Sequence, residues 1–189
     1  PGVRPSAGSM KSLKVSDYEA IAKLDGVKAA SPMTNGSYVV IYQNKNWTTS
    51  VSGVSYNYLD VNNWSMKSGR FLSEKNVQNR ERVAVVGKTV VKNLFGDEDP
   101  VGAEIRVKNI PFRIIGVLNS KGSGAMGNDQ DDMVIIPYTT AMERVEGVDY
   151  LRMIYVVGKD ENGIDRLQSD IENLLRVRPV SYTHLTLPT

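Results

Sequence analysis

Apolar positions near the two ends of the chain recur with helical spacing. The stripe within residues 164–176 is formed by Ile164, Leu167, Ile171, Leu174 and Leu175. The apolar face of residues 16–24 is formed by Ala20, Ile21 and Leu24. Ser16 and Glu19 match a capping box, and Gly26 follows as a stop signal. We therefore expect one amphipathic helix near each end.

Between these helices, most apolar runs are short and rich in β-branched residues, which is typical of strands. Residues 37–43 and 47–53 flank a polar turn and predict a hairpin, and residues 104–108 and 112–118 predict a second. Further strands are expected at 27–30, 81–88, 132–138 and 151–157. The first of these is expected to end before Pro32.

Two short helices are expected among the strands. One covers residues 90–95, and the other opens with a capping box at Thr140 and Glu143 and ends at Gly147. Residues 64–76 show no regular pattern and are expected to form an irregular loop. Because helices and strands are interspersed, the fold class predicted from the pattern is α+β with a mixed sheet.

Composition narrows the class of protein. The net charge of +2 comes from 23 basic and 21 acidic residues among 189, without a basic stripe, so we expect no nucleic-acid partner. There is no cysteine, and no apolar run approaches the roughly 18–20 residues that span a bilayer. A chain of this length buries enough surface to fold without a disulfide or metal.

Residues 180–189 differ from the rest of the chain. They carry no acidic or basic side chain other than His184 and show no apolar periodicity, and they resemble a translated sequencing adapter. We interpret them as a non-native tail that contributes nothing to folding. The tail contains the only histidine, so the remaining body has neither His nor Cys. Nucleophilic triads usually need a histidine base, so none is expected.

The sharpest motif is the glycine-rich stretch at 122–127, which reads G-x-G-x-x-G. A dinucleotide site needs a helix to begin within this loop, with its N-terminus facing the pyrophosphate. Here an acidic stretch and a strand follow instead. We therefore interpret Gly122, Gly124 and Gly127 as parts of a flexible loop, and we expect no cofactor.

Carboxylates offer two further candidates. Asp129, Asp131 and Asp132 alternate as calcium ligands can, but the glycine and glutamate of an EF-hand loop are missing, so they are interpreted as solvated loop residues. An acidic cluster at 97–99 precedes Pro100 and is explained by turn chemistry. A Ser123–Lys121 pair stays open as a weak catalytic alternative. We expect no metal and no catalytic residue, and hence no enzyme.

The order of motifs is more informative than any one of them. The chain resembles the extracytoplasmic core domain of MacB-type ABC-transporter permeases over residues 11–178. The similarity is carried by VSGVSYNYLDVNNWSMKSGRFLSEKN (51–76), RVAVVGKTVVKNLFG (82–96), DPVGAEIRVKNIPFRIIGVL (99–118) and DQDDMVIIPYTTAMERV (129–145).

The resemblance implies a fold of two lobes. A lobe similar to the porter subdomain of efflux pumps would contain βα units from both chain ends, at about 11–49 and 123–178. A second, β-rich lobe would be inserted between them at about 50–122.

The resemblance also implies a function. The domain would lie outside the cell membrane, catalyse nothing, and couple ATP hydrolysis in the cytoplasm to export or release of a substrate. Implied partners are a cytoplasmic ATPase, a second permease protomer and a periplasmic adaptor. The alternative is a free-standing extracytoplasmic ligand-binding or sensor module.

We also expect the loop with Lys121 and its neighbouring glycines and aspartates to be mobile. It is the candidate contact for a substrate or partner, through Lys121, Gly122, Gly124, Gly127, Asp129, Asp131 and Asp132.

Overall fold

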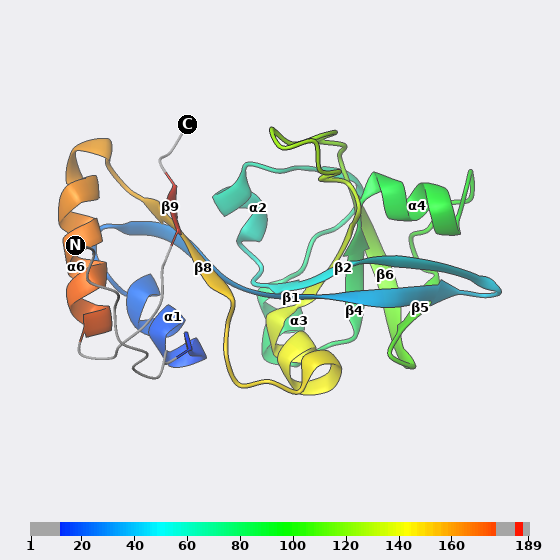
Figure 1. The fold of residues 1–189 in the computed structure, drawn as a ribbon, viewed down its shortest axis with the longest axis horizontal. Helices are drawn as coiled ribbons and strands as arrows, with labels where there is room; N and C mark the ends of the chain where they lie inside the picture. Colours follow the sequence, from blue (N-terminus) through cyan, green and yellow to red (C-terminus); the bar gives the residue numbers. More distant parts are fainter. Residues whose placement is uncertain (1–11, 177–183, 187–189) are drawn as a thin grey trace, which may run out of the picture.

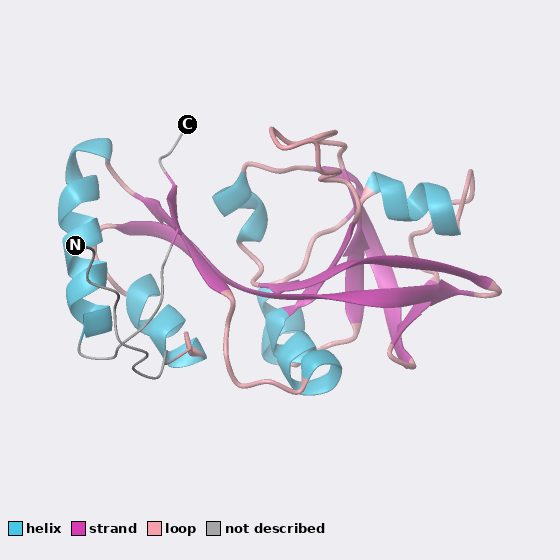
Figure 2. Cartoon of the chain, in the orientation of Figure 1, coloured by secondary structure: helices cyan, strands magenta, loops and turns pink. Residues whose placement is uncertain are grey.

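A computed structural model describes residues 12–176 and 184–186 (Figure 1). It is a mixed assembly of strands and short helices, with α1 and α6 at one end and most of the strands, surrounded by further short helices, at the other (Figure 2). The α+β class predicted from the hydrophobic pattern is confirmed in this form. Within the described residues, no helix is long and apolar enough to cross a membrane.

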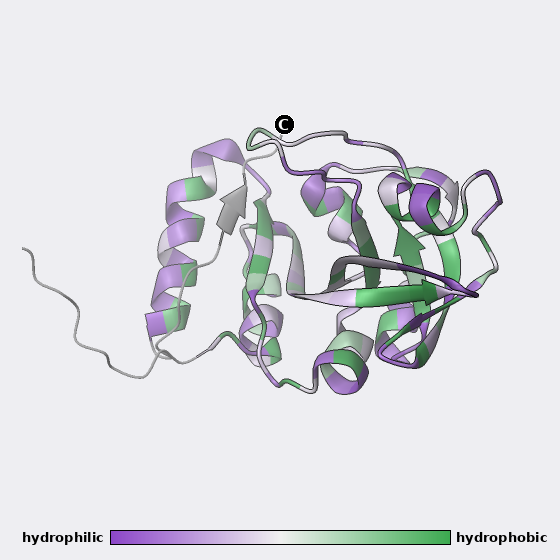
Figure 3. Cartoon of the chain, turned by 45° about the vertical axis from the view of Figure 1, so that its right-hand side comes forward, coloured by the Kyte–Doolittle hydropathy of each residue, from purple (hydrophilic) through white to green (hydrophobic). Residues whose placement is uncertain are grey.

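The helical end is built by α1 (Val15–Ala22) and α6 (Ile164–Arg176), which lie against β1 (Val27–Tyr42) and β8 (Met153–Gly158). A 3-10 turn, η2 (Glu161–Gly163), leads into α6. Hydrophilic and hydrophobic positions alternate along α6 (Figure 3). The α6 side chains buried in the shared core are Leu167, Ile171 and Leu175. The two predicted amphipathic helices are confirmed.

The N-terminus of α1 is capped differently from the prediction. Asp17 is buried, and its carboxylate accepts a hydrogen bond of 2.8 Å from the backbone N–H of Lys14. Asp17 is the third residue of the helix, where a carboxylate can reach back to the capping residue. The N-cap is Lys14, so the helix begins two residues earlier than the Ser16–Glu19 box predicted.

Strand β1 is much longer than predicted. It was expected to stop before Pro32, but it runs on to Tyr42, is 16 residues long, and connects the two ends of the molecule (Figure 1). Its pairing with β2 (Lys45–Val54) begins only at Met33. Pro32 therefore lies where one edge of β1 has no ladder partner, and a missing N–H is tolerated at such an edge.

At the other end, six strands close into a ring. β1 pairs with β2, β2 with β7 (Met133–Pro137), β7 with β4 (Val83–Val86), and β4 with β6 (Ile110–Leu118). β6 then pairs with β5 (Glu104–Val107), and β5 returns to β1. The β2–β7 and β4–β6 pairs are parallel, whereas the others are antiparallel. Both predicted hairpins, β1–β2 and β5–β6, are confirmed as parts of this barrel.

The barrel encloses one of three apolar cores. Its largest fully buried strand residues are Val40, Val51, Ile105, Phe112, Ile114 and Ile136. Two helices add side chains to this core. α4 (Lys88–Leu94) contributes Val90 and Leu94, and the π-helix η1 (Ala141–Glu146) contributes Ala141 and Val145. Because the ring is closed, its strands protect each other's edges.

The segment predicted as an irregular loop at 64–76 is partly regular. It contains β3 (Met66–Gly69), which pairs with β6, and it leads into α3 (Glu74–Gln78). Ser73 caps α3 by accepting from the Asn76 N–H. Together with α2 (Tyr58–Asn62), these elements contribute to a third core over the outside of the barrel. Strands and helices of four or five residues are too short to show a period in the sequence.

The capping box predicted at Thr140 is absent. The short helix α5 (Tyr138–Thr140) runs directly into η1, and the Thr140 hydroxyl donates to the carbonyl of Glu81 at 2.8 Å. That hydrogen bond ties α5 to the segment before β4 and replaces a local cap. The predicted stop is correct, since Gly147 has φ of 63° at the end of η1.

The predicted division into lobes cuts across these contacts. The expected boundary at residues 49–50 lies inside β2, and residues 133–146 share the barrel core with β1 and β2. The helical core instead draws mainly on residues 13–30 and 151–175, and it also contains Val77, Tyr138 and Met142. These contacts favour a smaller helical lobe, and the lobe boundaries stay a prediction.

The tail predicted to be non-native falls mostly outside the described residues. Its residues 184–186 form β9 (His184–Thr186), which lies parallel to Tyr155–Val157 of β8. A strand added at this position continues the sheet beyond β8. The foreign origin of residues 180–189 and their lack of contribution to folding stay predictions.

Candidate functional site: the glycine-rich loop and the lobe junction

The loop between β6 and β7 is organised around one buried carboxylate. Asp131 is only 4% exposed. It accepts hydrogen bonds from the Ser120 hydroxyl at 2.5 Å, the Lys121 N–H at 2.7 Å and the Gly122 N–H at 3.1 Å. The prediction that Asp131 is a solvated loop residue is therefore wrong. The loop folds back on itself, so its last residues bind its first.

The charge state of Asp131 follows from these contacts. Burial alone would raise the pKa of Asp131, because a carboxylate loses hydration in the interior. The three hydrogen bonds, helped by the positive charge of Lys88, outweigh burial and lower the pKa below its ordinary value. Asp131 is therefore an anion at neutral pH and serves as the anchor of the loop.

The two neighbouring aspartates bind different elements. Asp132 accepts from Trp47 Nε1 at 2.9 Å and from the Thr49 hydroxyl at 2.7 Å, both on β2. Asp129 accepts from the Thr89 hydroxyl of α4 at 2.5 Å and from the Asp131 N–H at 2.9 Å. The loop is thus bound to the barrel wall on one side and to α4 on the other.

Lys121 binds a third element. Its ammonium group donates to the carbonyl of Asn62 at 2.8 Å and lies 4.5 Å from the centre of the Trp64 ring, a cation–π distance. Partial burial lowers the pKa of Lys121. Among the described residues, no hydrogen bond joins Lys121 to Ser123, so the pair predicted as a weak catalytic alternative is not assembled here.

The glycines serve the geometry of the loop. Gly122 and Gly127 have φ of 74° and 76°, which L-residues rarely adopt. A Cβ on Gly124 would lie 2.6 Å from Asn128 Oδ1. The Gly124 N–H donates to the Asn128 carbonyl at 2.8 Å, and the Gly127 N–H donates to the Gly124 carbonyl at 2.9 Å. Both amides, like that of Gly122, are used within the loop.

This geometry predicts that the domain does not bind ATP or NAD through the motif. A phosphate needs free backbone N–H groups at a helix N-terminus, whereas β7 follows the loop. Calorimetry with each nucleotide at about millimolar concentration, where micromolar sites would saturate, is expected to give only heat of dilution. Saturable heat that disappears in Gly124→Val would contradict this prediction.

The tip of the loop differs from its base. Ser123 and Asp129 form an isolated antiparallel bridge, and the Gly127–Gly124 hydrogen bond closes a tight turn beyond it. Met126 is on this turn and is 96% exposed. The next most exposed large apolar side chain among the described residues is Val39, at 48%. The base of the loop, which includes Lys121 and Asp129 to Asp132, is therefore held by hydrogen bonds. The turn at 124–127, which forms the tip, makes few contacts with the rest of the domain.

The acidic cluster at 97–99 lies in a turn, as predicted. Asp99 Oδ1 accepts from the Val101 N–H at 3.0 Å, and the Glu98 carboxylate accepts from the Tyr42 hydroxyl at 3.3 Å. Within residues 12–176, no group of three or more acidic or histidine side chains is arranged to hold a metal ion. These contacts supply no acid–base pair.

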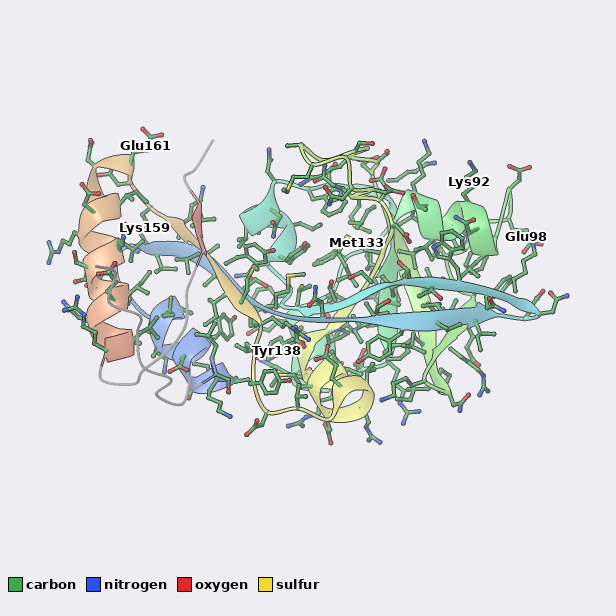
Figure 4. The ribbon with its side chains drawn as sticks, in the orientation of Figure 1. Lys92, Glu98, Met133, Tyr138, Lys159 and Glu161 are labelled. Carbon is green, nitrogen blue, oxygen red and sulfur yellow. The ribbon has the colours of Figure 1, made fainter. Side chains whose placement is uncertain are left out.

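Sequence reasoning missed the junction between the helical end and the barrel. Two edge-to-face tyrosine pairs bridge it, each with ring centroids 6.0 Å apart. Tyr18 of α1 contacts Tyr138 of α5, and Tyr58 of α2 contacts Tyr155 of β8. Figure 4 labels Tyr138 where the two ends meet. Only the contacts between the paired rings reveal this role, because single tyrosines in strands and turns of a sequence predict ordinary packing.

The two tyrosine pairs lie in different cores. Tyr138 packs in the helical core, whereas Tyr58 and Tyr155 pack with the core outside the barrel. Burial raises the pKa of Tyr138 to about 12 and also raises that of Tyr58. Both rings are therefore neutral at physiological pH, and their role is packing between the two ends of the molecule.

The chain is similar to known transporter proteins. Residues 2–174 match the model of the MacB-like periplasmic core domain. A macrolide export ATP-binding/permease protein MacB from Rhodospirillum rubrum is 42% identical over 180 residues, which cover 94% of this chain. One from Wolinella succinogenes is 38% identical over the same length. The chain spans 28% of the length of each relative.

Solved structures of transporter domains are also similar to this chain. The periplasmic region of MacB from Actinobacillus actinomycetemcomitans has a TM-score of 0.78 and 26% identity, covering 89% of this chain and 75% of that one. The extracellular domain of the transporter YknZ from Gram-positive bacteria shares the fold, with a TM-score of 0.77, 18% identity, and coverage of 90% and 86%. The chain belongs to the MacB-like periplasmic core domain family.

Proposed function

We propose that this domain is the extracytoplasmic part of an ABC-transporter permease and couples ATP hydrolysis in the cytoplasm to export of a substrate. The observation that carries this proposal is 42% identity over 94% of the chain to a protein named for macrolide export and for an ATP-binding part. Because residues 2–174 match the periplasmic core domain model, we assign the ATP-binding part to another region of the full-length transporter. The domain's own contribution is mechanical and non-catalytic.

The structure supports a mechanical role through its connections. β1 runs from the helical core into the barrel, and β8 pairs with its first half. The two tyrosine pairs bridge the ends at this passage. A displacement of the helical end is therefore transmitted to the barrel through a continuous strand and two packed contacts. In this proposal the helical end is the porter-like lobe and the barrel is the inserted lobe, with boundaries that differ from those predicted at residues 49–50 and 122–123.

The partners follow from the same proposal. The domain works outside the cell membrane, next to a second permease protomer and a periplasmic adaptor where the cell has one. A cytoplasmic ATPase, either fused or separate, supplies the energy.

Deletion in the full-length protein tests the proposal. Residues 12–176 are replaced by a short flexible linker, and the protein is purified in detergent and in proteoliposomes. We expect basal ATP hydrolysis to persist, because the nucleotide site lies elsewhere, and macrolide export to fall to background. A full-length variant whose ATP-binding part has been inactivated provides the control for zero hydrolysis.

Two outcomes would contradict the proposal. Export that survives the deletion would mean that the domain is not needed for coupling. A full-length gene product without flanking membrane spans or a matching ATPase would instead favour a free-standing binding or sensor module.

A further inference from the structure

Within residues 12–176, the chain passes between the helical end and the barrel only twice. The first passage is β1, which pairs with β8 up to Met33 and with β2 from Met33 onward. The second is the segment at 147–152, which leads from η1 to β8 and begins at Gly147. The Arg152 N–H donates to the Met33 carbonyl at 2.9 Å, so the two passages lie side by side. A narrow ribbon therefore joins the two ends (Figure 1).

The ribbon is supported on both of its faces. Successive side chains of a strand point to opposite sides, so odd and even positions belong to different faces. Ile154 of β8 packs in the helical core, as Tyr138 does. Met33 and Tyr155 pack with the core outside the barrel, as Tyr58 does. The α1–α5 tyrosine pair therefore supports one face of the ribbon, and the α2–β8 tyrosine pair supports the other.

The two faces are not held equally. On the face of the α1–α5 pair, the barrel end places Val77, Tyr138 and Met142 in the helical core, where all three are buried. On the other face, Met33 and Tyr155 are only partly buried where they meet the outer core. Burial of apolar surface supplies most of the stability of such contacts. The α2–β8 contact is therefore the weaker of the two.

We propose that β1 at Ser31–Met33 is a hinge that opens on one side only, by separating the rings of Tyr58 and Tyr155 while the α1–α5 pair stays closed. The inference rests on the proposed function for the force that moves the hinge. Because the barrel is closed by strand pairing, bending is confined to the narrow ribbon outside it. The hinge deepens the mechanical role by giving the displacement a defined direction.

The local chemistry of the ribbon suits a hinge. Pro32 lies at its centre and has no N–H to contribute to a strand ladder. Beside it, the Ser31 hydroxyl oxygen accepts from the Ser55 N–H at 3.1 Å and connects the barrel end to β1. A bond next to the axis changes little in length when the ends rotate. The larger displacement falls on the tyrosine rings, which lie farther out.

Spin-label distance measurements on the 189-residue chain test the hinge. The chain contains no cysteine, so labels are attached at cysteines that replace Asp60 on α2 and Lys159 after β8, both exposed (Figure 4). We expect a major short distance and a minor long one. Tyr155→Leu keeps an apolar side chain but removes the ring pair, so it is expected to raise the long-distance population by about three- to ten-fold.

Two variants control for the substitution itself. Tyr42→Leu also removes a ring pair, that of Tyr42 and Phe95 with centroids 4.1 Å apart, but within the barrel. It is expected to leave the label distances unchanged. Tyr155→Phe keeps an aromatic ring and is expected to retain the wild-type populations. Circular dichroism establishes that each variant is folded before its distances are compared.

A second label pair tests whether the hinge opens on one side. Cysteines replace Lys23 after α1 and Arg144 on η1, which are exposed residues flanking the α1–α5 contact. We expect a single distance between them in the wild type and in Tyr155→Leu. A change as large as that between Asp60 and Lys159 would overturn the one-sided opening.

The outcomes separate the hinge from the proposed function. One unchanged Asp60–Lys159 distance in both the wild type and Tyr155→Leu would overturn the hinge. In the full-length transporter, with these labels at its only cysteines, ATP is expected to shift the two populations, and the absence of a shift would overturn the hinge as part of coupling. A wild-type transporter without ATP-dependent export would overturn the proposed function, while a hinge measured in the 189-residue chain would stand.

Discussion

Asp131→Ala is expected to destabilise the isolated domain by about 3 kcal/mol, because it leaves one hydroxyl and two backbone N–H groups without their acceptor. For a domain of this size, that corresponds to a fall in melting temperature of roughly 6–12 °C. Thermal unfolding followed by circular dichroism measures it. Faster amide exchange at Lys121 and Gly122 would show that the loss begins at the loop.

The matched control is Asp160→Ala. Asp160 is exposed and also accepts a hydrogen bond from a backbone N–H, that of Asn162 at 3.0 Å. We expect a change below about 1 kcal/mol there, as for most exposed sites. Equal effects at the two positions would mean that the buried network around Asp131 contributes no more than a surface turn.

The same network predicts the direction of a pH effect. The folded pKa of Asp131 is lower than its ordinary value, so the carboxylate contributes stability that is present above about pH 4, the unfolded pKa. That contribution is lost as the pH falls through the folded pKa. The wild-type domain should therefore lose more stability than Asp131→Ala between neutral pH and the acid range.

Gly87→Ala is expected to lower the free energy of unfolding by about 3 kcal/mol, because the added methyl group would clash with the backbone. A Cβ at this position would lie 2.1 Å from the carbonyl oxygen of Asp131, and backbone atoms cannot move aside as a flexible side chain can. The φ of Gly87 is −83°, which alanine adopts freely, so backbone strain plays no part. Urea unfolding measures the loss directly.

Gly163→Ala is the control for this substitution. A Cβ there would have no heavy atom within 4 Å, and its backbone has no positive φ. We expect Gly163→Ala to be neutral or slightly stabilising, because alanine reduces the freedom of the unfolded chain. A tolerated Gly87→Ala would contradict the close approach of the loop to the start of α4.

Many elements of this fold were predictable from local patterns. α6 has an apolar stripe long enough to show its period, and the β1–β2 and β5–β6 hairpins join strands that are adjacent in sequence. The turn between β5 and β6 has positive φ at Lys108 and Asn109, the geometry that suits a two-residue hairpin. Each of these signals lies within about 20 residues of sequence, where side-chain spacing alone is informative.

The candidate site was only half predictable. Glycines and aspartates at 122–132 predicted a loop, and the loop is there. The sequence could not show that Asp131 is buried or that Asp132 binds Trp47, because the latter contact joins residues 85 positions apart. The sequence shows that a residue is an aspartate, but not whether water or backbone amides surround its carboxylate. That environment decides whether the side chain is solvated or holds the loop in place.

By itself, the sequence determined the two amphipathic helices near the chain ends, the hairpins, the mixed α+β class and the family. The tertiary structure decided that β1 continues through Pro32, that β2 and β4 each gain a parallel partner, and that six strands close into a barrel. It also decided which carboxylates are anchors and left Met126 exposed at the loop tip. The physical reason is that the spacing of residues along the chain decides which side chains share one face of a helix or strand. Strand pairing and side-chain burial instead depend on segments that meet only after folding.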